Sequence, residues 1–269
     1  MVDFTPFTPD AAALAITPPE PSDDKYSRGV LGIITGSSTY PGAAVLGVDA
    51  ALRTGVGMVR YVGPERATEL VLQRRPEAVS GTGRVQAWLM GSGTDHADLG
   101  RKTTRHFESA LAEGLPAILD GGALEFAELA TGPTIITPHA GELARLLGID
   151  RSEVSPDSAI EAAERFGVVV VLKGHETFVV GGSERFVASS ATPWLATAGS
   201  GDALAGIMGA LVATQREAAT VESLARVAAA ASVIHGLAAE RASRGGPVTV
   251  LDVTAALRAT IAELLRSRA

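Results

Sequence analysis

The chain has 269 residues, of which 46% are hydrophobic and 20% are charged, and its formal net charge is −7. The acidic balance disfavours non-specific binding to nucleic acid, and the lack of cysteine excludes disulfides, thiolate catalysis and cysteine-ligated metal centres. We find no signal-peptide pattern and no apolar run of about 18 residues, so we expect a cytoplasmic protein with no membrane partner.

Strand and helix patterns alternate along the chain. Residues 1–27, rich in Pro, Asp and Ser, are expected to form an extended arm with a short helix at Asp10–Ala15, followed by a single domain over residues 28–269. Apolar runs predict strands at Val30–Thr35, Met58–Val62, Ala87–Met90, Ala117–Leu119, Thr134–Thr137 and Val168–Leu172, and a hairpin at Thr177–Val180 and Arg185–Ala188. Helices are expected at Gly42–Arg53, Glu65–Gln73, Leu99–Glu113, Pro138–Leu147, Pro156–Phe166, Asp202–Thr214, Val221–Arg241 and Leu251–Arg266.

This alternation predicts an α/β fold with a mainly parallel sheet covered by helices on both faces. Ligands of such sheets bind beyond the carboxyl ends of the strands. Five residues lie at or just after predicted strand ends and are expected to line one edge together: Gly36, Gly91, Asp120, Thr137 and Lys173. The functional site is therefore expected along this edge.

The stretch Thr197–Gly206 places three glycines around one acid, directly before an apolar run. A Gly-rich turn that opens a buried helix presents free N–H groups to an anion. We therefore expect Gly199, Ser200 and Gly201 to form an anion hole, and Asp202 to remove a proton from the group that attacks a bound phosphate. The alternative is a simple turn with Asp202 as the helix N-cap.

Two further segments follow strands and carry polar side chains. In Thr137–Glu142, His139 is suited to bond a substrate amide or hydroxyl, and Glu142 is suited to orient water around Mg²⁺; a plain helix start is the alternative. In Lys173–Thr177, the lysine is suited to phosphate, and an ordinary hairpin corner is the alternative. Outside these segments, three histidines are expected to be structural or exposed: His96, His106 and His235.

These segments together resemble the ADP/ATP-dependent NAD(P)H-hydrate dehydratase family of the ribokinase-like superfamily. The resemblance covers roughly Lys25 to the C-terminus and is carried, in the family's order, by Gly36–Ala44, Ala51–Gly57, Thr137–Glu142, Lys173–Thr177 and Ala198–Gly206. Two positions depart from the family's pattern. Ser92 stands where a proline is usual, and Asp24-Lys25-Tyr26 stands in place of His-Lys-Gly.

The resemblance implies a three-layer αβα ribokinase-like fold and the repair of nicotinamide nucleotides. The implied reaction is ADP- or ATP-dependent dehydration of the S epimer of hydrated NADH or NADPH, with release of AMP or ADP and phosphate. The resemblance implies that the nicotinamide hydrate binds near Ala43, Gly93, His139 and Asp202. It implies that the adenine nucleotide binds Lys173, Gly174, His175, Glu176, Thr177 and Gly201. It also implies Mg²⁺, a homotetramer and a partner epimerase on a separate chain.

In the expected mechanism, Asp202 takes the proton from the ring hydroxyl of the hydrate, whose oxygen attacks the terminal phosphoryl group. Phosphate leaves more readily than hydroxide, so elimination restores the dihydropyridine ring. Two alternatives stay open. A ribokinase-like kinase of a hydroxyalkyl heterocycle or a sugar would use the same loop and base, and a nucleotide-sensing module would bind without turnover.

Overall fold

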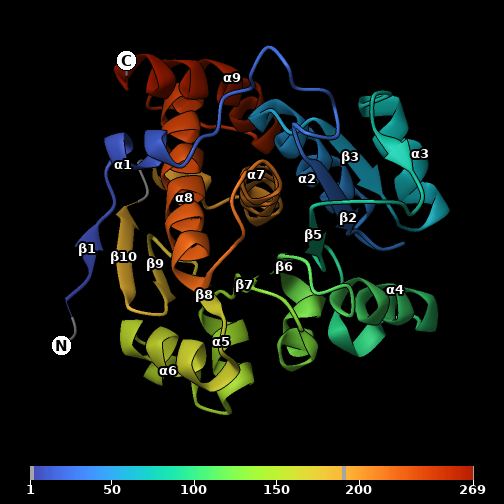
Figure 1. The fold of residues 1–269 in the computed structure, drawn as a ribbon. Coiled ribbons are helices and arrows are strands. Elements are labelled where there is room, and N and C mark those ends of the chain that lie inside the picture. The colour runs from blue at the N-terminus through green and yellow to red at the C-terminus, as the bar shows by residue number, and fades with distance from the viewer. Residues whose placement is uncertain (1–2, 190–191, 269) are drawn as a thin grey trace.

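The centre of the protein is one ten-stranded sheet (Figure 1). The computed structural model describes residues 3–189 and 192–268. The strand order is β1-β10-β9-β8-β7-β6-β5-β2-β3-β4. The strands are β1 (Thr5–Pro6), β2 (Val30–Ile34), β3 (Met58–Tyr61), β4 (Val79–Ser80), β5 (Ala87–Met90), β6 (Ala117–Leu119), β7 (Thr134–Ile136), β8 (Val169–Leu172), β9 (Glu176–Gly181) and β10 (Glu184–Ser189). All pairs from β8 to β4 are parallel, whereas β9 pairs antiparallel with both β8 and β10.

Helices cover both faces of this sheet and give three layers (Figure 1). The α-helices are α1 (Pro9–Leu14), α2 (Pro41–Thr54), α3 (Glu65–Arg74), α4 (Arg101–Leu111), α5 (Ala140–Leu147), α6 (Pro156–Phe166), α7 (Ser200–Ala213), α8 (Val221–Ser243) and α9 (Val250–Ser267). Short 3₁₀ helices span His96–Asp98, Gly121–Leu129, Arg151–Glu153 and Pro193–Leu195. One hydrophobic cluster joins the sheet to α1, α2, α3, α7, α8 and α9, and a second joins it to α4, α5 and α6.

Burial on both faces explains why the central strands are apolar at almost every position. In β8, Val169 and Val171 belong to the first cluster, whereas Val170 and Leu172 belong to the second. Successive side chains of a strand point to opposite faces, so a strand with two covered faces needs an unbroken apolar run. The predicted parallel strands match the observed ones to within one residue at each end.

The long helix α8 is packed inside the protein. By length and composition it is apolar enough to cross a membrane, which the sequence search for apolar runs did not anticipate. In the structure, 72% of its most apolar window is buried. Such burial is typical of a core helix, and its alanines allow α7 and α9 to pack closely against it.

The N-terminal segment carries the expected short helix, α1, and packs against the rest of the protein. Strand β1 pairs in parallel with β10, and α1 inserts Ala12 and Ala13 into the first hydrophobic cluster. Local composition did not predict these contacts, because β1 is only two residues long and is held by its partner strand. Helix α5 also begins two residues later than predicted, at Ala140, because His139 forms an isolated bridge with Lys173.

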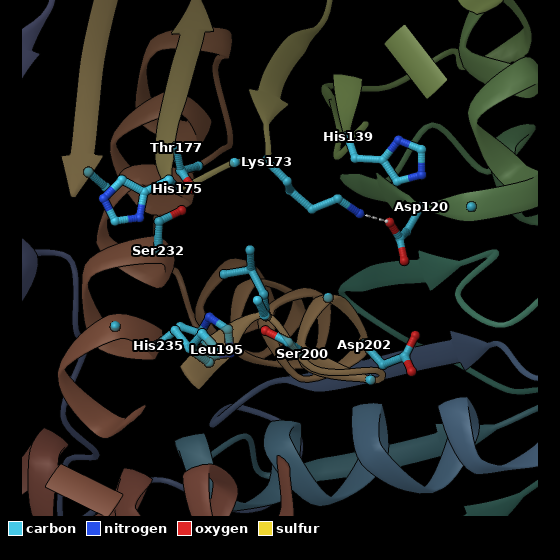
Figure 2. Close-up of a pocket in the computed structure, with 18 of the residues that line it drawn as sticks. Asp120, His139, Lys173, His175, Thr177, Leu195, Ser200, Asp202, Ser232 and His235 are labelled. Atoms are coloured by element: carbon cyan, nitrogen blue, oxygen red, sulfur yellow. Dashed lines mark hydrogen bonds and ion pairs between the residues drawn. The ribbon is translucent and has the colours of Figure 1, made fainter. Parts of the chain in front are cut away.

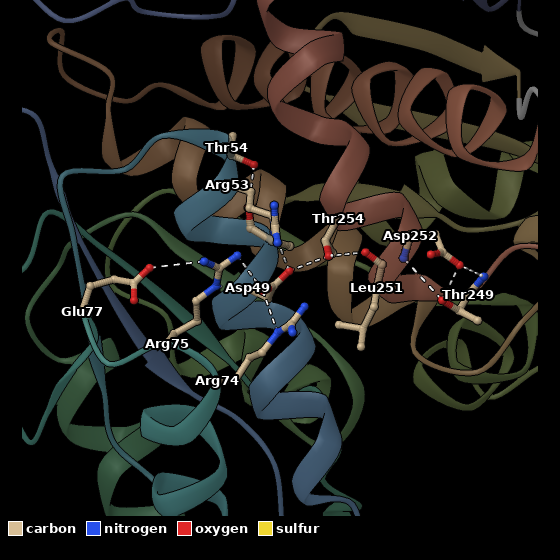
Figure 3. Close-up of polar contacts among 11 residues, drawn as sticks. Asp49, Arg53, Thr54, Arg74, Arg75, Glu77, Thr249, Leu251, Asp252 and Thr254 are labelled. Carbon is tan, nitrogen blue, oxygen red and sulfur yellow. Dashed lines mark hydrogen bonds and ion pairs between the residues drawn. The ribbon is translucent and has the colours of Figure 1, made fainter.

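A buried charge cluster ties α2 to α9 and to the end of α3 (Figure 3). The Asp49 side chain is fully buried and accepts hydrogen bonds from the Nε atoms of three arginines and from the Thr254 hydroxyl. The N–O distances are 3.0 Å to Arg53, 3.3 Å to Arg74 and 2.7 Å to Arg75. Burial opposes ionisation of Asp49, but these partners outweigh it and hold the pKa of the carboxyl below its usual range.

We expect Asp49→Ala to lower the free energy of unfolding by about 3–5 kcal/mol, because it leaves three arginines without their shared buried counter-charge. Thr254→Val is the control. It removes one hydrogen bond to the same carboxylate, and we expect it to cost only about 1 kcal/mol. Urea unfolding followed by circular dichroism measures both values. Equal, small losses in the two variants would show that the cluster contributes little to stability.

Candidate active site

A cavity of about 660 Å³ opens at the carboxyl edge of the parallel strands (Figure 2). The cavity lies beside the point where the strand order reverses, between β2 and β5. The loops that follow these two strands are joined there by a hydrogen bond, in which the Gly36 N–H donates to the Ser92 carbonyl at 2.7 Å. The sequence-predicted residues that line it are Gly93, His139, Glu142, Lys173, Gly174, His175, Thr177, Gly199, Ser200, Gly201 and Asp202. Residues far apart in the sequence therefore share one cavity.

Two predicted site residues do not line this cavity. Ala43 lies beneath Gly93, where a Cβ added to the glycine would come within 2.3 Å of the alanine Cβ. Only glycine at position 93 therefore leaves room for this contact. Glu176 is exposed at the start of β9, where it pairs with Ser189.

Helix α7 points its N-terminus at the cavity. Its N-cap is Gly199, which has a φ of 89° that favours glycine. Asp202 is the third residue of the helix, so the interpretation of this aspartate as an N-cap is wrong. The Ser200 N–H donates to the Thr197 carbonyl at 3.3 Å. The N–H groups of Gly201 and Asp202 are therefore the helix-terminal donors that suit an anion.

The ends of β6, β7 and β8 meet in an ion pair between Asp120 and Lys173. The sequence placed both residues at strand ends but did not predict that they pair. Lys173 Nζ donates to Asp120 Oδ1 at 2.7 Å, and the Thr137 hydroxyl donates to the same oxygen at 2.7 Å. Glu142 Oε2 lies 4.0 Å from Lys173 Nζ. Asp120 also lines the cavity. Its position directly after a strand was the available signal, and the predicted shared edge of these strand ends is confirmed.

These contacts set the charges around the anion-binding donors. Burial opposes ionisation of both Asp120 and Lys173, but mutual attraction and hydrogen bonding hold the pKa of Asp120 below and that of Lys173 above its usual range. A Cβ added to Gly201 would lie 3.5 Å from Lys173 Nζ, so the ammonium group adjoins the start of α7. The site thus keeps a permanent positive charge beside the helix N-terminus.

The pKa of Asp202 is shifted in the opposite direction from that of Asp120. Burial and the charge of Asp120 raise its pKa to about 7, against a smaller opposing effect of Lys173. A carboxylate with this pKa exchanges protons readily at neutral pH, as a general base requires. Strongly raised pKa values of this kind are concentrated at functional sites.

His139 and Glu142 form a capping box at the start of α5. The Glu142 N–H donates to His139 Nδ1 at 3.1 Å, and the His139 N–H donates to Glu142 Oε2 at 2.8 Å. The expected helix start is therefore present. Because Nδ1 accepts a hydrogen bond, the neutral ring carries its proton on Nε2. His139 can thus also donate to a ligand in the cavity, since its side chain is 61% exposed.

The three histidines read as structural or exposed have different environments. His96 packs edge-on against Phe126, with ring centroids 5.7 Å apart, and His106 lines a separate pocket of about 160 Å³. His235 is buried in α8 and lines the main cavity. No local pattern predicts this position, because His235 lies inside an alanine-rich run that is typical of a core helix.

A family model described as NAD(P)H-hydrate dehydratase matches residues 31–260. The chain belongs to this family. It is 40% identical over 209 residues to the bifunctional NAD(P)H-hydrate repair enzyme Nnr of Mycobacterium tuberculosis, a match that covers 73% of this chain and 43% of that protein. It is 35% identical over 242 residues to the ADP-dependent (S)-NAD(P)H-hydrate dehydratase of Neisseria meningitidis, covering 80% and 78% of the two chains.

The fold agrees with the family. The crystal structure of the ADP/ATP-dependent NAD(P)H-hydrate dehydratase from Bacillus subtilis, co-crystallised with ATP/Mg²⁺, matches 98% of this chain and all of that one, with a TM-score of 0.88 and 22% sequence identity. This likeness confirms the predicted three-layer ribokinase-like fold. The chain spans less than half the length of the bifunctional relatives that it matches.

We expect Asp202→Asn to stabilise the protein at pH 8 and to change its stability little at about pH 4. The folded chain binds a proton at Asp202 up to about pH 7, whereas the unfolded chain loses it near the ordinary value of 3.8. The free energy of unfolding therefore falls as the pH rises between these values. Asparagine has no charge to bury and avoids this loss, which we expect to be roughly 1–3 kcal/mol for a partly exposed side chain.

Urea unfolding curves of both proteins at several pH values measure this difference. An equal effect of the substitution at low and at high pH would contradict the raised pKa of Asp202.

Proposed function

We propose that this protein dehydrates the S epimer of hydrated NADH or NADPH, with ADP or ATP as the phosphoryl donor. The products are NADH or NADPH, phosphate, and AMP or ADP. The observation that carries the proposal is Asp202, a carboxyl group with a pKa of about 7 beside the free N–H groups that open α7. The names of the relatives from Neisseria and Xanthomonas, both ADP-dependent (S)-NAD(P)H-hydrate dehydratases, support the same reaction.

The two substrates are assigned to opposite sides of the start of α7. The nicotinamide hydrate binds near Gly93, His139 and Asp202, with Ala43 supporting Gly93 from below. This assignment is supported by the shared cavity and by the free donor of His139. The adenine nucleotide binds along residues 173–177 and at Gly201. Glu176 belongs to this segment through its backbone position, since its side chain lies outside the cavity lining.

In the proposed reaction, Asp202 accepts the proton of the ring hydroxyl, and the hydroxyl oxygen attacks the terminal phosphorus of the nucleotide. The N–H groups of Gly201 and Asp202, which follow the glycine N-cap at Gly199, oppose the negative charge that develops on the phosphoryl oxygens. Lys173 adds a fixed positive charge beside them. The N–H of Ser200, predicted as part of the anion hole, is instead bonded to the Thr197 carbonyl. The bond between the terminal phosphorus and its bridging oxygen breaks, and AMP or ADP is released. The carbon–oxygen bond of the phosphorylated hydrate then breaks, phosphate leaves, and loss of a proton from the adjacent ring carbon restores the reduced ring.

The acidic residues of the cavity suit Mg²⁺ held mainly by the nucleotide. Within residues 3–189 and 192–268, no three His, Cys, Asp or Glu side chains are grouped to hold a metal ion. Mg²⁺ typically needs only one or two protein carboxylates beside substrate phosphates. Glu142 and Asp120 supply such groups, and we assign Glu142 the contact through water. When bound, the ion would neutralise phosphate charge.

We further propose a cytoplasmic homotetramer that acts together with an epimerase. The link with a second repair activity is supported by the relatives named bifunctional NAD(P)H-hydrate repair enzymes. The small-molecule kinase is the less favoured function, since the relatives that match most of this chain are named dehydratases.

We expect Asp202→Asn to lower turnover by roughly 10²- to 10⁴-fold, the contribution of a positioned general base, and to leave the dissociation constant of ADP nearly unchanged. The assay follows the recovery of reduced-nicotinamide absorbance from hydrated NADH with ADP, and calorimetry gives the ADP affinity. Asp157→Asn, in the first turn of α6 and exposed, is the matched control. Near-normal turnover of Asp202→Asn would overturn the proposed base.

We expect the value of kcat/KM to rise with pH around a midpoint near 7, because the free enzyme must have Asp202 ionised. Asp120→Asn is expected to move this midpoint to lower pH. It removes a negative charge that raises the pKa of Asp202, and it leaves the positive charge of Lys173 uncompensated. Rate profiles of the two proteins between about pH 5 and 9 test this. If the midpoint does not move, the charge of Asp120 does not affect the pKa of Asp202.

A further inference from the structure

One buried polar group in the cavity has no place in the proposed chemistry. His235 is 6% exposed, lines the cavity, and its Nε2 atom has no hydrogen-bond partner among the described residues. Burial lowers the pKa of the imidazole to about 4, so the ring is neutral at physiological pH. Buried polar atoms without a partner are rare in proteins and mark places where a ligand or water completes the bonding.

Ser232 lies one turn earlier on the same helix, and its hydroxyl group can only accept a hydrogen bond from a ligand. Its hydroxyl donates to the Ala228 carbonyl at 3.0 Å, so its own proton is already used. Ser232 is 8% exposed and lines the cavity, so its oxygen can serve a ligand there only as an acceptor. Residues three apart in a helix share one face, so this acceptor stands beside the imidazole.

The pair lies at the end of the cavity remote from Asp202. Figure 2 shows Ser232 and His235 together with Leu195 on one side of Ser200, while Asp202 and Asp120 lie on the other. The start of α7, with its anion-binding donors, separates the two ends. A nucleotide whose phosphates occupy those donors and whose terminal phosphorus faces Asp202 directs its base toward α8.

The walls at this end suit a flat ring. Leu195 lies at this end (Figure 2), and the other apolar residues that line the cavity are Ala188, Pro193, Ala196 and Leu204. A mostly apolar pocket with a few convergent polar groups is the usual form of a site for a small organic ligand. The polar residues that α8 contributes are Ser232 and His235, and Ser189 and Thr192 also line the cavity.

We propose that Ser232 and His235 select adenine as the base of the nucleotide. The Ser232 oxygen accepts a hydrogen bond from the 6-amino group, and the imidazole N–H donates to a ring nitrogen of the base. Purines with oxygen at position 6, such as hypoxanthine and guanine, place an acceptor opposite the serine acceptor and are rejected. This inference rests on the proposed nucleotide-dependent function and adds the residues that choose the base.

The test compares ADP with inosine 5′-diphosphate (IDP), which differs from ADP in carrying oxygen in place of the 6-amino group. Calorimetry measures both dissociation constants without any turnover. We expect the unaltered protein to bind ADP roughly 10- to 100-fold more tightly than IDP, the discrimination typical of a bidentate base contact. Ser232→Ala is expected to remove most of this preference by weakening ADP alone, and His235→Leu to weaken ADP about 10-fold.

Ser243→Ala is the matched control, because Ser243 lies on the same helix, also donates its hydroxyl to a backbone carbonyl, and lies outside the cavity lining. It should leave both affinities unchanged. Equal affinity of the unaltered protein for ADP and IDP would overturn the base assignment alone. Equal weakening of both nucleotides by Ser232→Ala would also overturn it and indicate a ribose contact. Failure to bind either nucleotide would overturn the proposed function as well.

Discussion

The pairing of Lys173 with Asp120 is the contact on which the rest of the site depends. Three parallel strands end side by side, and this brings an aspartate, a threonine and a lysine into one hydrogen-bonded group. A buried ammonium group without a counter-charge would be strongly disfavoured. The aspartate therefore keeps the lysine charged and fixes it beside the start of α7. The same aspartate raises the pKa of Asp202 through its negative charge. Burial is the larger cause of that raised pKa, and Lys173 opposes it. The ion pair thus fixes a positive charge beside the start of α7 and also influences the pKa of Asp202.

Helix α7 divides the cavity into two chemical environments. Toward Asp202 and His139, the walls carry carboxylates, a lysine and a free imidazole donor, which suits proton and phosphoryl transfer. Toward α8, the walls are apolar and hold a neutral histidine. This division follows from packing. The helix is buried from Ala203 to Ala213, and its first turn, which follows the glycine N-cap with a φ of 89°, lines the cavity.

Features of the fold that depend on short stretches of chain were predictable from the sequence. Ser155 and Pro156 mark the start of α6, and the structure places the helix at Pro156–Phe166 as expected. Each central strand was predicted from a mostly apolar run of residues, because both of its faces are covered. The two-residue strands β1 and β4 were missed, since pairs of residues carry no periodic pattern and are held by their neighbours in the sheet.

The sequence by itself determined the family, the α/β architecture and the set of strand-end segments that carry polar residues, because glycine turns, strand runs and motif spacing are local properties. Only the tertiary structure showed that Asp120 pairs with Lys173, that Asp202 is not the cap of its helix, and that His235 lines the cavity. The physical reason is that charge state and hydrogen bonding depend on neighbours in space. Asp120 and Lys173 are 53 positions apart in the chain, and sheet order alone brings them together.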